Sequence, residues 1–314
     1  MRKHLSTLLK IAVTLIALGF VFTQVDLRDI GQRFLDVNVG WLLIAFLLVN
    51  TSFLPRAWRW LELLRGLGQE VAFWRLVALY FVGNFFNTFL PSGVGGDVVR
   101  AVEIAQDVEA GPAAGTVIVD RATGLLTLFV IGLVAMPFRP ADFPPELVWQ
   151  ITAVCFFGIV GIMVMIEGSL VRALAKRIPG FLAPIWRKLE NMILAVGACG
   201  WPALWRAIGI SFLFNFMQIG WWATAGLALG YNVALPHYFL VTPILAISIL
   251  MPSVGGLGVR ESIAPLLFAS AGLSAAEAVS LSLLVFALQR VSGLLGGPIY
   301  LMEILRRNRE KVAG

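Results

Sequence analysis

The sequence has few charged residues, and that scarcity excludes an ordinary soluble protein. Asp, Glu, Lys and Arg make up 13% of the 314 residues, whereas a soluble globular domain carries about 25%. Apolar residues reach 59%. A membrane-spanning helix needs about 20 apolar residues, so this length holds about six to eight spans with their loops and no soluble catalytic domain besides. The sequence therefore indicates an integral membrane protein.

Cysteine and histidine are also scarce, which argues against several kinds of site. The two cysteines, Cys155 and Cys199, lie far apart and without metal-ligand spacing, so neither a disulfide framework nor a zinc site is indicated. His4 and His237 fall near expected membrane edges, and no nucleophile, histidine and acid can be combined into a catalytic set. No strand precedes Gly93-Val94-Gly95, so it is not a dinucleotide fingerprint. We expect no enzyme activity and no cofactor.

Basic residues are in excess, and their positions indicate topology. The formal net charge is +6, and Lys and Arg gather in the cytoplasmic loops of membrane proteins. We therefore interpret the charge as a topology signal and expect no nucleic-acid partner. Basic residues follow the apolar runs 39–54, 147–166 and 278–302, which places these three ends in the cytoplasm. Both termini are expected to be cytoplasmic.

Apolar runs predict an all-α polytopic membrane protein with about six full spans. The first run follows basic residues as in a signal peptide, but no small-residue cleavage site follows it, so we expect an uncleaved anchor. Residues 167–200 are basic and in places amphipathic, and we expect this segment to lie along the cytoplasmic membrane surface. The six runs are 11–21, 39–54, 117–136, 147–166, 204–229 and 278–302.

Two stretches of the chain resemble each other and indicate an internal duplication. Leu90-Pro91-Ser92-Gly93-Val94-Gly95-Gly96-Asp97-Val98-Val99-Arg100 is matched by Met251-Pro252-Ser253-Val254-Gly255-Gly256-Leu257-Gly258-Val259-Arg260-Glu261. A second pair follows in the same order, Asp120-Arg121-Ala122-Thr123-Gly124 and Gln289-Arg290-Val291-Ser292-Gly293. We interpret residues 1–314 as a single transmembrane domain, with repeat halves at about 39–137 and 203–303.

The place of the repeated motif predicts two re-entrant helical hairpins. The neighbouring spans leave an even number of crossings within 66–116 and again within 230–275. In each region the apolar arms beside the motif reach about 15 residues, whereas a full span needs about 20. One hairpin would enter from the cytoplasm and the other from the opposite side, so the duplication is expected to be inverted. Paired helix breaks of this kind form the binding sites of transporters.

The repeated motif contains the parts of an anion site. Its glycines permit close approach by a ligand, and a helix that begins near Asp97 would point free amide groups into the break. Arg100 could hold a phosphate through two hydrogen bonds. An arginine at the bilayer centre costs roughly 2.5 to 3.5 kcal/mol, so these arginines should face a wet cavity or acidic partners. The candidate substrate-binding residues are Ser92, Gly95, Gly96, Asp97, Arg100, Asp120, Arg121, Ser253, Gly255, Gly256, Arg260, Glu261 and Arg290.

A purely structural role is the alternative for these residues. Small residues also mediate ordinary helix packing in membranes, and the same arginines and acids could form buried ion pairs that pin the two repeats together. Polar residues within apolar runs, such as Asn84, Asn87 and Asn215, are explained as readily by interhelical hydrogen bonds. Asp97 has no acidic match at Leu257, so the two copies need not be equivalent.

The paired motif resembles that of the flippase-like membrane family typified by the transmembrane region of lysylphosphatidylglycerol synthase. The resemblance covers about residues 5–305 and is carried by the stretch 90–100 and its match at 252–260. It implies a protein of the bacterial inner membrane that moves or accommodates a lipid headgroup across the bilayer. Bifunctional relatives carry a separate soluble aminoacylating domain, and no segment of this sequence corresponds to it.

We therefore expect a flippase- or scramblase-like lipid transporter for a phospholipid or other lipid with an anionic headgroup. The phosphate would lie near Arg100 and Arg260, with Arg121 and Arg290 along the path. No ATP-binding motif is present, so movement would be passive, ion-coupled or dependent on a partner. Membrane lipids are the expected partners, and a lipid-synthesis enzyme is a further candidate. The alternatives are a membrane-embedded lipid-phosphate transferase or hydrolase that uses Asp97 or Asp120, and a scaffold for a lipid-synthesis enzyme.

Overall fold

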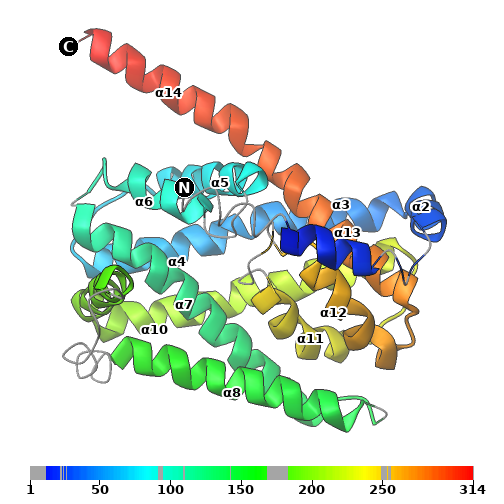
Figure 1. Ribbon diagram of the computed structural model, residues 1–314. Helices are drawn as coiled ribbons and strands as arrows, with labels where there is room; N and C mark the ends of the chain where they lie inside the picture. Colours follow the sequence, from blue (N-terminus) through cyan, green and yellow to red (C-terminus); the bar gives the residue numbers. More distant parts are fainter. Residues whose placement is uncertain are drawn as a thin grey trace.

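Every regular element in the part of the chain that the structure describes is a helix (Figure 1). The computed structural model describes residues 12–21, 23, 25, 27–90, 95–108, 110–141, 143–167, 183–248, 253 and 256–313. The α-helices are α2 (Leu27–Leu35), α3 (Val39–Thr51), α4 (Phe53–Gly66), α5 (Phe73–Phe89), α6 (Gly95–Ile104), α7 (Ala110–Ala135), α8 (Pro145–Glu167), α10 (Ala183–Ala228), α11 (Leu235–Ile247), α12 (Val259–Phe268), α13 (Ala275–Leu294) and α14 (Gly296–Ala313). Residues Ala12–Val21, which fall within the predicted run 11–21, form a further short apolar helix. Two short 3-10 turns are η1 (Met136–Phe138) and η4 (Ala269–Ala271). The predicted all-α class is confirmed.

Four helices in the described residues are long and apolar enough to cross a membrane. They are Val39–Gly66, Gly115–Phe138, Pro145–Glu167 and Ala275–Leu305. These four contain the predicted runs 39–54, 117–136, 147–166 and 278–302. All of the run 204–229 except its last residue lies within α10, where Asn215 and Gln218 interrupt the apolar sequence. The total of six spans stays a prediction.

The second predicted span was placed too short. It was expected to end at Leu54, before Pro55, with Arg56 and Arg59 marking the cytoplasm. The structure instead continues through Ser52 into α4, so one apolar helix runs from Val39 to Gly66. Proline is tolerated in the first turn of a helix, because the amide group it lacks has no intrahelical acceptor there. Arg56 and Arg59 therefore lie inside a candidate span, and only Arg65 lies near its end.

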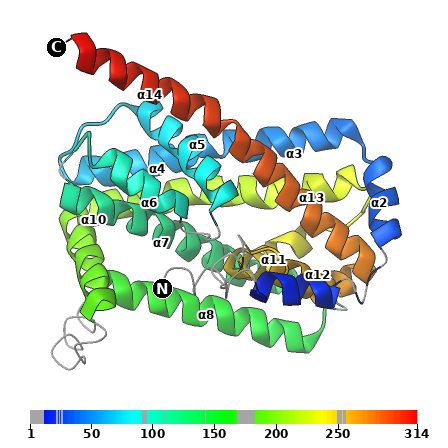
Figure 2. The same ribbon diagram turned by 45° about the horizontal axis from the view of Figure 1, so that its top comes forward.

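Two pairs of shorter helices surround the repeated motif. In the first pair α5 has 17 residues and α6 has 10; in the second pair α11 has 13 and α12 has 10. All four are shorter than the roughly 20 residues of a full span. Each pair packs together, and Figures 1 and 2 place the two pairs in different parts of the bundle. Re-entrance and an inverted relation between the halves stay predictions.

The helix α10 forms the centre of the bundle, where it packs against α3, α4 and α7 (Figure 2). Gly200, with φ 75° and ψ 155°, interrupts its helical backbone just before Pro202. A positive φ of this size is strained for residues that carry a Cβ, so glycine suits the kink. The kink separates residues 183–199 from the longer helical stretch that follows. Of the predicted surface segment 167–200, residues 168–182 lie outside the described part.

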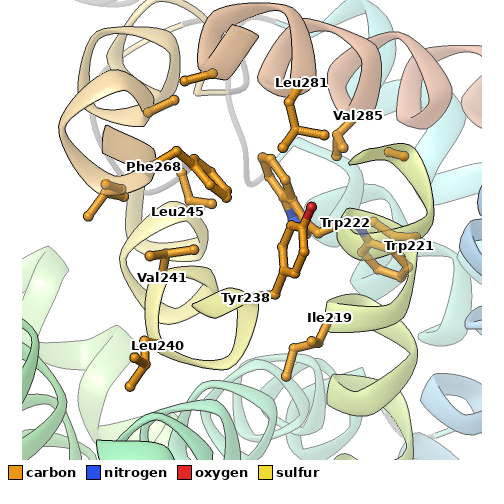
Figure 3. Close-up of a cluster of buried hydrophobic side chains, with 14 of the residues drawn as sticks. Ile219, Trp221, Trp222, Tyr238, Leu240, Val241, Leu245, Phe268, Leu281 and Val285 are labelled. Carbon is orange, nitrogen blue, oxygen red and sulfur yellow. The ribbon is translucent and has the colours of Figure 1, made fainter. Parts of the chain in front are cut away.

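A buried aromatic and aliphatic cluster fixes the packing of α10, α11, α12 and α13 (Figure 3). The ring of Phe268 stacks on Trp222 with centroids 6.4 Å apart and meets the edge of Tyr238 at 5.8 Å. By contrast, α8 exposes large apolar side chains such as Phe157 and Trp149. An apolar helix face that is exposed in the bundle is suited to contact with lipid tails.

Candidate functional site

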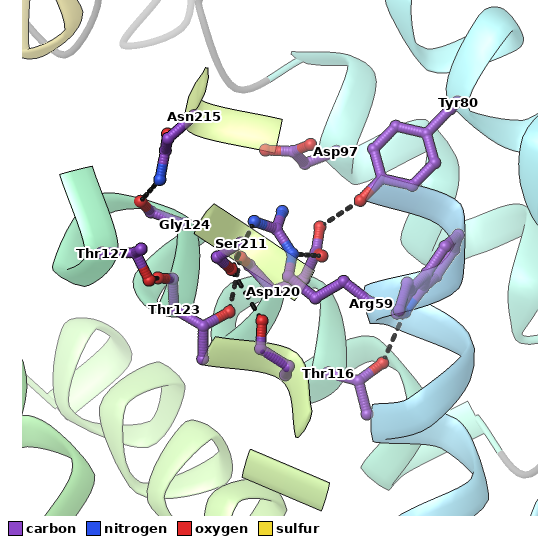
Figure 4. A network of polar contacts seen from close by, with 12 residues as sticks. Arg59, Tyr80, Asp97, Thr116, Asp120, Thr123, Gly124, Thr127, Ser211 and Asn215 are labelled. Carbon is purple, nitrogen blue, oxygen red and sulfur yellow. Dashed lines mark hydrogen bonds and ion pairs between the residues drawn. The ribbon is translucent and has the colours of Figure 1, made fainter. Parts of the chain in front are cut away.

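A buried ion-pair cluster joins α4, α5, α6 and α7. We call it the Asp120 cluster, and it consists of Arg59, Tyr80, Asp97, Arg100 and Asp120. Figure 4 shows the contacts of Asp120 with Arg59 and Tyr80. One carboxylate oxygen of Asp120 accepts from Arg59 Nε at 2.6 Å. The other oxygen accepts from Arg100 Nη2 at 3.1 Å and from the Tyr80 hydroxyl. Arg100 also pairs with Asp97, three residues before it, at 3.2 Å. The cluster therefore holds two arginines on one fully buried carboxylate.

Aromatic rings hold the Arg100 guanidinium from its other sides. Its central carbon lies 3.7 Å from the ring centroid of Tyr80 and 4.2 Å from that of Trp60. The Trp60 indole in turn donates to the Thr116 hydroxyl at 2.8 Å. A cation over an aromatic face gains roughly 0.5 to 2 kcal/mol, the larger values applying where water is excluded. Arg100 is 2% exposed, so its charge is compensated within the protein.

The second motif copy forms a separate, smaller cluster. We call it the Glu261 cluster, and it consists of Gly258, Arg260, Glu261 and Ser282. Arg260 pairs with Glu261 at 3.2 Å and donates to the hydroxyl and the carbonyl of Ser282, both at 2.9 Å. The other oxygen of Glu261 accepts from the amide of Gly258 at 2.7 Å, at the start of α12. Arg260 and Glu261 therefore have partners close by in sequence, and Arg260 has further partners on α13.

A polar cavity of about 160 Å³ lies between α3, α4, α5, α7, α10 and α13. Three arginines line it: Arg56 on α4, Arg121 on α7 and Arg290 on α13. Arg121 and Arg290 come from the second pair of similar stretches in the sequence, and the fold brings them to one cavity. The full lining is Val49, Ser52, Phe53, Arg56, Asn84, Asn87, Arg121, Trp221, Gln289 and Arg290.

Among the described residues, a carboxylate pairs with Arg121, whereas Arg56 and Arg290 contact aromatic rings and a backbone carbonyl. Arg121 forms an ion pair with Asp97, which also binds Arg100. Arg56 stacks on Tyr80 at 4.6 Å from the ring centroid, and no carboxylate within the described ranges pairs with it. Arg290 donates to the Asn87 carbonyl at the end of α5 and lies 4.4 Å from the Phe286 ring. The cavity is therefore strongly positive, which suits an anion.

The first motif copy supports the cavity wall. Gly96, in the first turn of α6, donates its amide to the Asn87 side chain at 2.7 Å. A Cβ on Gly96 would lie 2.0 Å from the carbonyl oxygen of Gly83, so glycine is required for this close approach of α6 to α5. The side chain of Asn87 thereby accepts from the Gly96 amide, and its backbone carbonyl accepts from Arg290. Its place in the wall therefore depends on contacts with α6 and α13.

The structure separates the charged candidate residues into three groups. Arg121 and Arg290 line the cavity. Asp97 forms an ion pair with Arg121. Arg100, Asp120, Arg260 and Glu261 are buried in ion pairs. Gly95 and Gly96 begin α6, and Gly256 lies in the turn before α12. Ser253 is buried, and its hydroxyl has no hydrogen-bond partner within the described residues. Ser92 and Gly255 lie outside the described residues.

Four further cavity residues with charged or amide side chains were not among the predicted site residues. Arg56 was interpreted as a cytoplasmic marker, and Asn84 and Asn87 as helix-packing residues. Gln289 was noticed only as the match to Asp120. A signal was present for Arg56, because it precedes Trp58-Arg59-Trp60 with apolar residues on both sides. An arginine inside a membrane span costs free energy unless it pairs with another group or faces a cavity.

Comparison with known proteins shows the family of the chain. Residues 7–297 match the family model described as the lysylphosphatidylglycerol synthase TM region. The chain is also 23% identical to UPF0104 membrane protein PH1989 of Pyrococcus horikoshii, over 90% of this chain and 92% of that protein. The family match covers most of the sequence and includes both copies of the motif. This multi-pass membrane protein belongs to the family of the lysylphosphatidylglycerol synthase TM region.

Proposed function

We propose that the protein translocates a lipid with an anionic headgroup across the membrane and holds the headgroup phosphate in the polar cavity. The observation that carries this proposal is the convergence of Arg56, Arg121 and Arg290 on one cavity, where Asp97 is the nearest paired carboxylate. Guanidinium groups bind phosphate through paired, charge-assisted hydrogen bonds. Asn84, Asn87 and Gln289 add neutral partners to the lining.

The size of the cavity favours a headgroup over a whole lipid. Its volume is about 160 Å³, equivalent to about five water molecules at roughly 30 Å³ each. That space accommodates a phosphate with a small substituent, whereas two acyl chains would remain in the surrounding bilayer. A translocating protein that shields only the polar end of its lipid removes the main barrier, because the charged group is the part that the hydrocarbon region disfavours.

The duplication suggests how such a cavity could open alternately. Arg121 comes from the first half of the chain, at about 39–137, and Arg290 from the second, at about 203–303. If the halves are inverted repeats, rocking of one against the other would expose their shared site to each side in turn. We place the protein in the bacterial inner membrane with both termini in the cytoplasm, in agreement with the basic loops.

The hydrolase or transferase alternative is less well supported by the geometry. Such chemistry needs a carboxylate that can attack or accept a proton. Both oxygens of Asp120 are bound by Arg59, Arg100 and Tyr80. Both oxygens of Asp97 are paired with arginine. A carboxylate that is fixed in this way is a weak base and a weak nucleophile.

Reconstitution tests the proposal. We expect wild-type protein to speed the movement of headgroup-labelled phosphatidylglycerol between leaflets of a liposome. The paired variant Arg56→Gln, Arg290→Gln should slow this movement at least tenfold, because two of the three cavity cations are lost. The matched control is Arg139→Gln, which changes an arginine just after η1 that is not part of the cavity lining. Equal rates for the wild type and the paired variant would refute the proposal.

A further inference from the structure

A second cavity, on the outer side of the bundle, combines an apolar groove with two exposed arginines. It lies along α4 and α10 and has a volume of about 520 Å³. We call it the α4–α10 groove. Its lining is Thr51, Leu54, Pro55, Trp58, Leu61, Arg65, Phe73, Leu213 and Met217. None of these residues lines the polar cavity, so the groove is a distinct feature of the molecule.

The groove has the length and chemistry of a lipid tail along most of its course. From Thr51 to Arg65 one continuous helix supplies a wall about 21 Å long, at 1.5 Å per residue. Leu54, Trp58 and Leu213 are exposed to 37%, 48% and 50%, so the groove is open along its length. Apolar side chains that are open to hydrocarbon suit an extended acyl chain.

Charge gathers at one end of the groove. Arg65 pairs with one oxygen of Glu62 at 3.0 Å, and Arg206 of α10 pairs with the other at 3.2 Å. The arginine side chains are 59% and 67% exposed, whereas the Glu62 side chain is 9% exposed. Two guanidinium groups therefore share one carboxylate, and their outer donors remain open. This end carries a net positive charge that a bound anion can compensate.

Aromatic residues indicate that the charged end lies at the level of the headgroups. Trp201 and Trp205 precede Arg206 on α10 and are 57% and 65% exposed. Trp74, next to the groove residue Phe73, is 70% exposed. Exposed tryptophans are typical of the membrane–water interface. Arg65 and Arg206 then lie where a lipid phosphate would lie when its tail occupies the groove.

We propose that the α4–α10 groove is a binding site for an anionic phospholipid, with the phosphate on Arg65 and Arg206 and one acyl chain between α4 and α10. Charge complementarity selects the headgroup, and the apolar wall selects the tail. The site does not depend on translocation. Its failure and that of the proposed function are separable, because each uses different arginines.

Lipid retention by the purified full-length protein tests the site. The delipidated protein in detergent is titrated with phosphatidylglycerol or phosphatidylcholine of identical chains, and bound lipid is counted by native mass spectrometry. Wild-type protein should retain phosphatidylglycerol more strongly. A juxtamembrane arginine contributes about fivefold, so Arg65→Gln with Arg206→Gln should weaken phosphatidylglycerol binding in the groove about 30-fold. The variant should then lose one bound phosphatidylglycerol, keep any that the polar cavity holds, and bind phosphatidylcholine as the wild type does. Replacing both arginines with lysine should keep most of the preference.

Equal retention of the two lipids by wild-type protein would overturn the proposal, since a groove filled by a partner helix or a second copy gives that result. Unchanged retention in the glutamine pair would overturn it as well. Arg139→Gln, at η1, is the matched control and should have no effect. If the glutamine pair fails to fold, Trp58 supplies an independent readout. Brominated phosphatidylglycerol should quench wild-type fluorescence more than that of Trp58→Phe, and equal quenching would count against the site.

Discussion

The two copies of the motif place an arginine in similar sequence positions but in different surroundings. Arg100 joins a cluster in which Asp97 and Asp120 are shared with Arg59 and Arg121, so it is linked to the polar cavity through one carboxylate. Arg260 pairs with its own neighbour Glu261 and with Ser282. The first cluster is an extended network, and the second is local. The two similar stretches of sequence therefore lie in different electrostatic surroundings.

The largest effect is expected from Asp120→Asn. This change removes the carboxylate that Arg59 and Arg100 share, and both arginines are buried. Breaking a buried pair costs about 3 to 5 kcal/mol, and two arginines are affected, so the upper end of this range is expected. The free energy of unfolding, measured by SDS titration in mixed micelles, gives the cost. A loss below about 1 kcal/mol, the value for exposed pairs, would mean that the network does not stabilise the fold.

Glu261→Gln should cost less, at about 3 kcal/mol, because one arginine loses its partner and Ser282 still accepts part of its charge. The same SDS titration compares it directly with Asp120→Asn. Anion binding at the polar cavity should remain as in the wild type, since the Glu261 cluster does not line it. If Glu261→Gln destabilised the protein more than Asp120→Asn, the contrast between a network and a local pair would be wrong.

Gly96→Ala tests the contact between α5 and α6. The added Cβ would lie 2.0 Å from the Gly83 carbonyl oxygen, so α6 must move away from α5. Overpacking of this kind costs about 1 to 3 kcal/mol. The movement should also release Asn87 and reduce anion binding at the cavity. Gly161→Ala is a suitable control, because a Cβ there meets nothing within 4 Å. Equal stability of the two variants would contradict the predicted contact.

Asp97→Asn should have the smallest effect, and its direction is informative. Asp97 competes with any anion for Arg121, so its neutralisation should tighten binding of a labelled anionic lipid by on the order of tenfold, or about 1.4 kcal/mol. Arg100 keeps Asp120 and should stay in place. Equilibrium titration of purified protein measures the change. Weaker binding would show that Asp97 supports the site and does not compete for it.

Hydropathy and charge predicted the class of the molecule well. Runs of apolar residues identified the four long helices, because membrane spans depend mainly on length and composition. The predicted end of the second span was wrong. A proline such as Pro55 usually indicates a helix end, but Pro55 lies in the first turn of α4. Local sequence does not reveal that a helix continues when the interruption is tolerated.

The candidate site could be predicted only in part. Arg121 and Arg290 stood out because charge in an apolar run needs a reason. The same argument applied to Arg100 and Arg260, but it could not tell a cavity arginine from an ion-paired one. That distinction depends on which helices pack together, and Asp120 meets Arg59 from 61 positions away. Arg56 was missed because a basic residue after an apparent span end has an ordinary topological explanation.

The most direct test of the central claim is a structure of the protein in lipid nanodiscs that contain phosphatidylglycerol. The account predicts headgroup density in the polar cavity, with phosphate oxygens within about 2.7 to 3.2 Å of donors on Arg56 and Arg290. Arg100 and Arg260 should keep their carboxylate partners and make no contact with the lipid. Density for phosphate beside Arg100 or Arg260, with the cavity free of lipid, would contradict it.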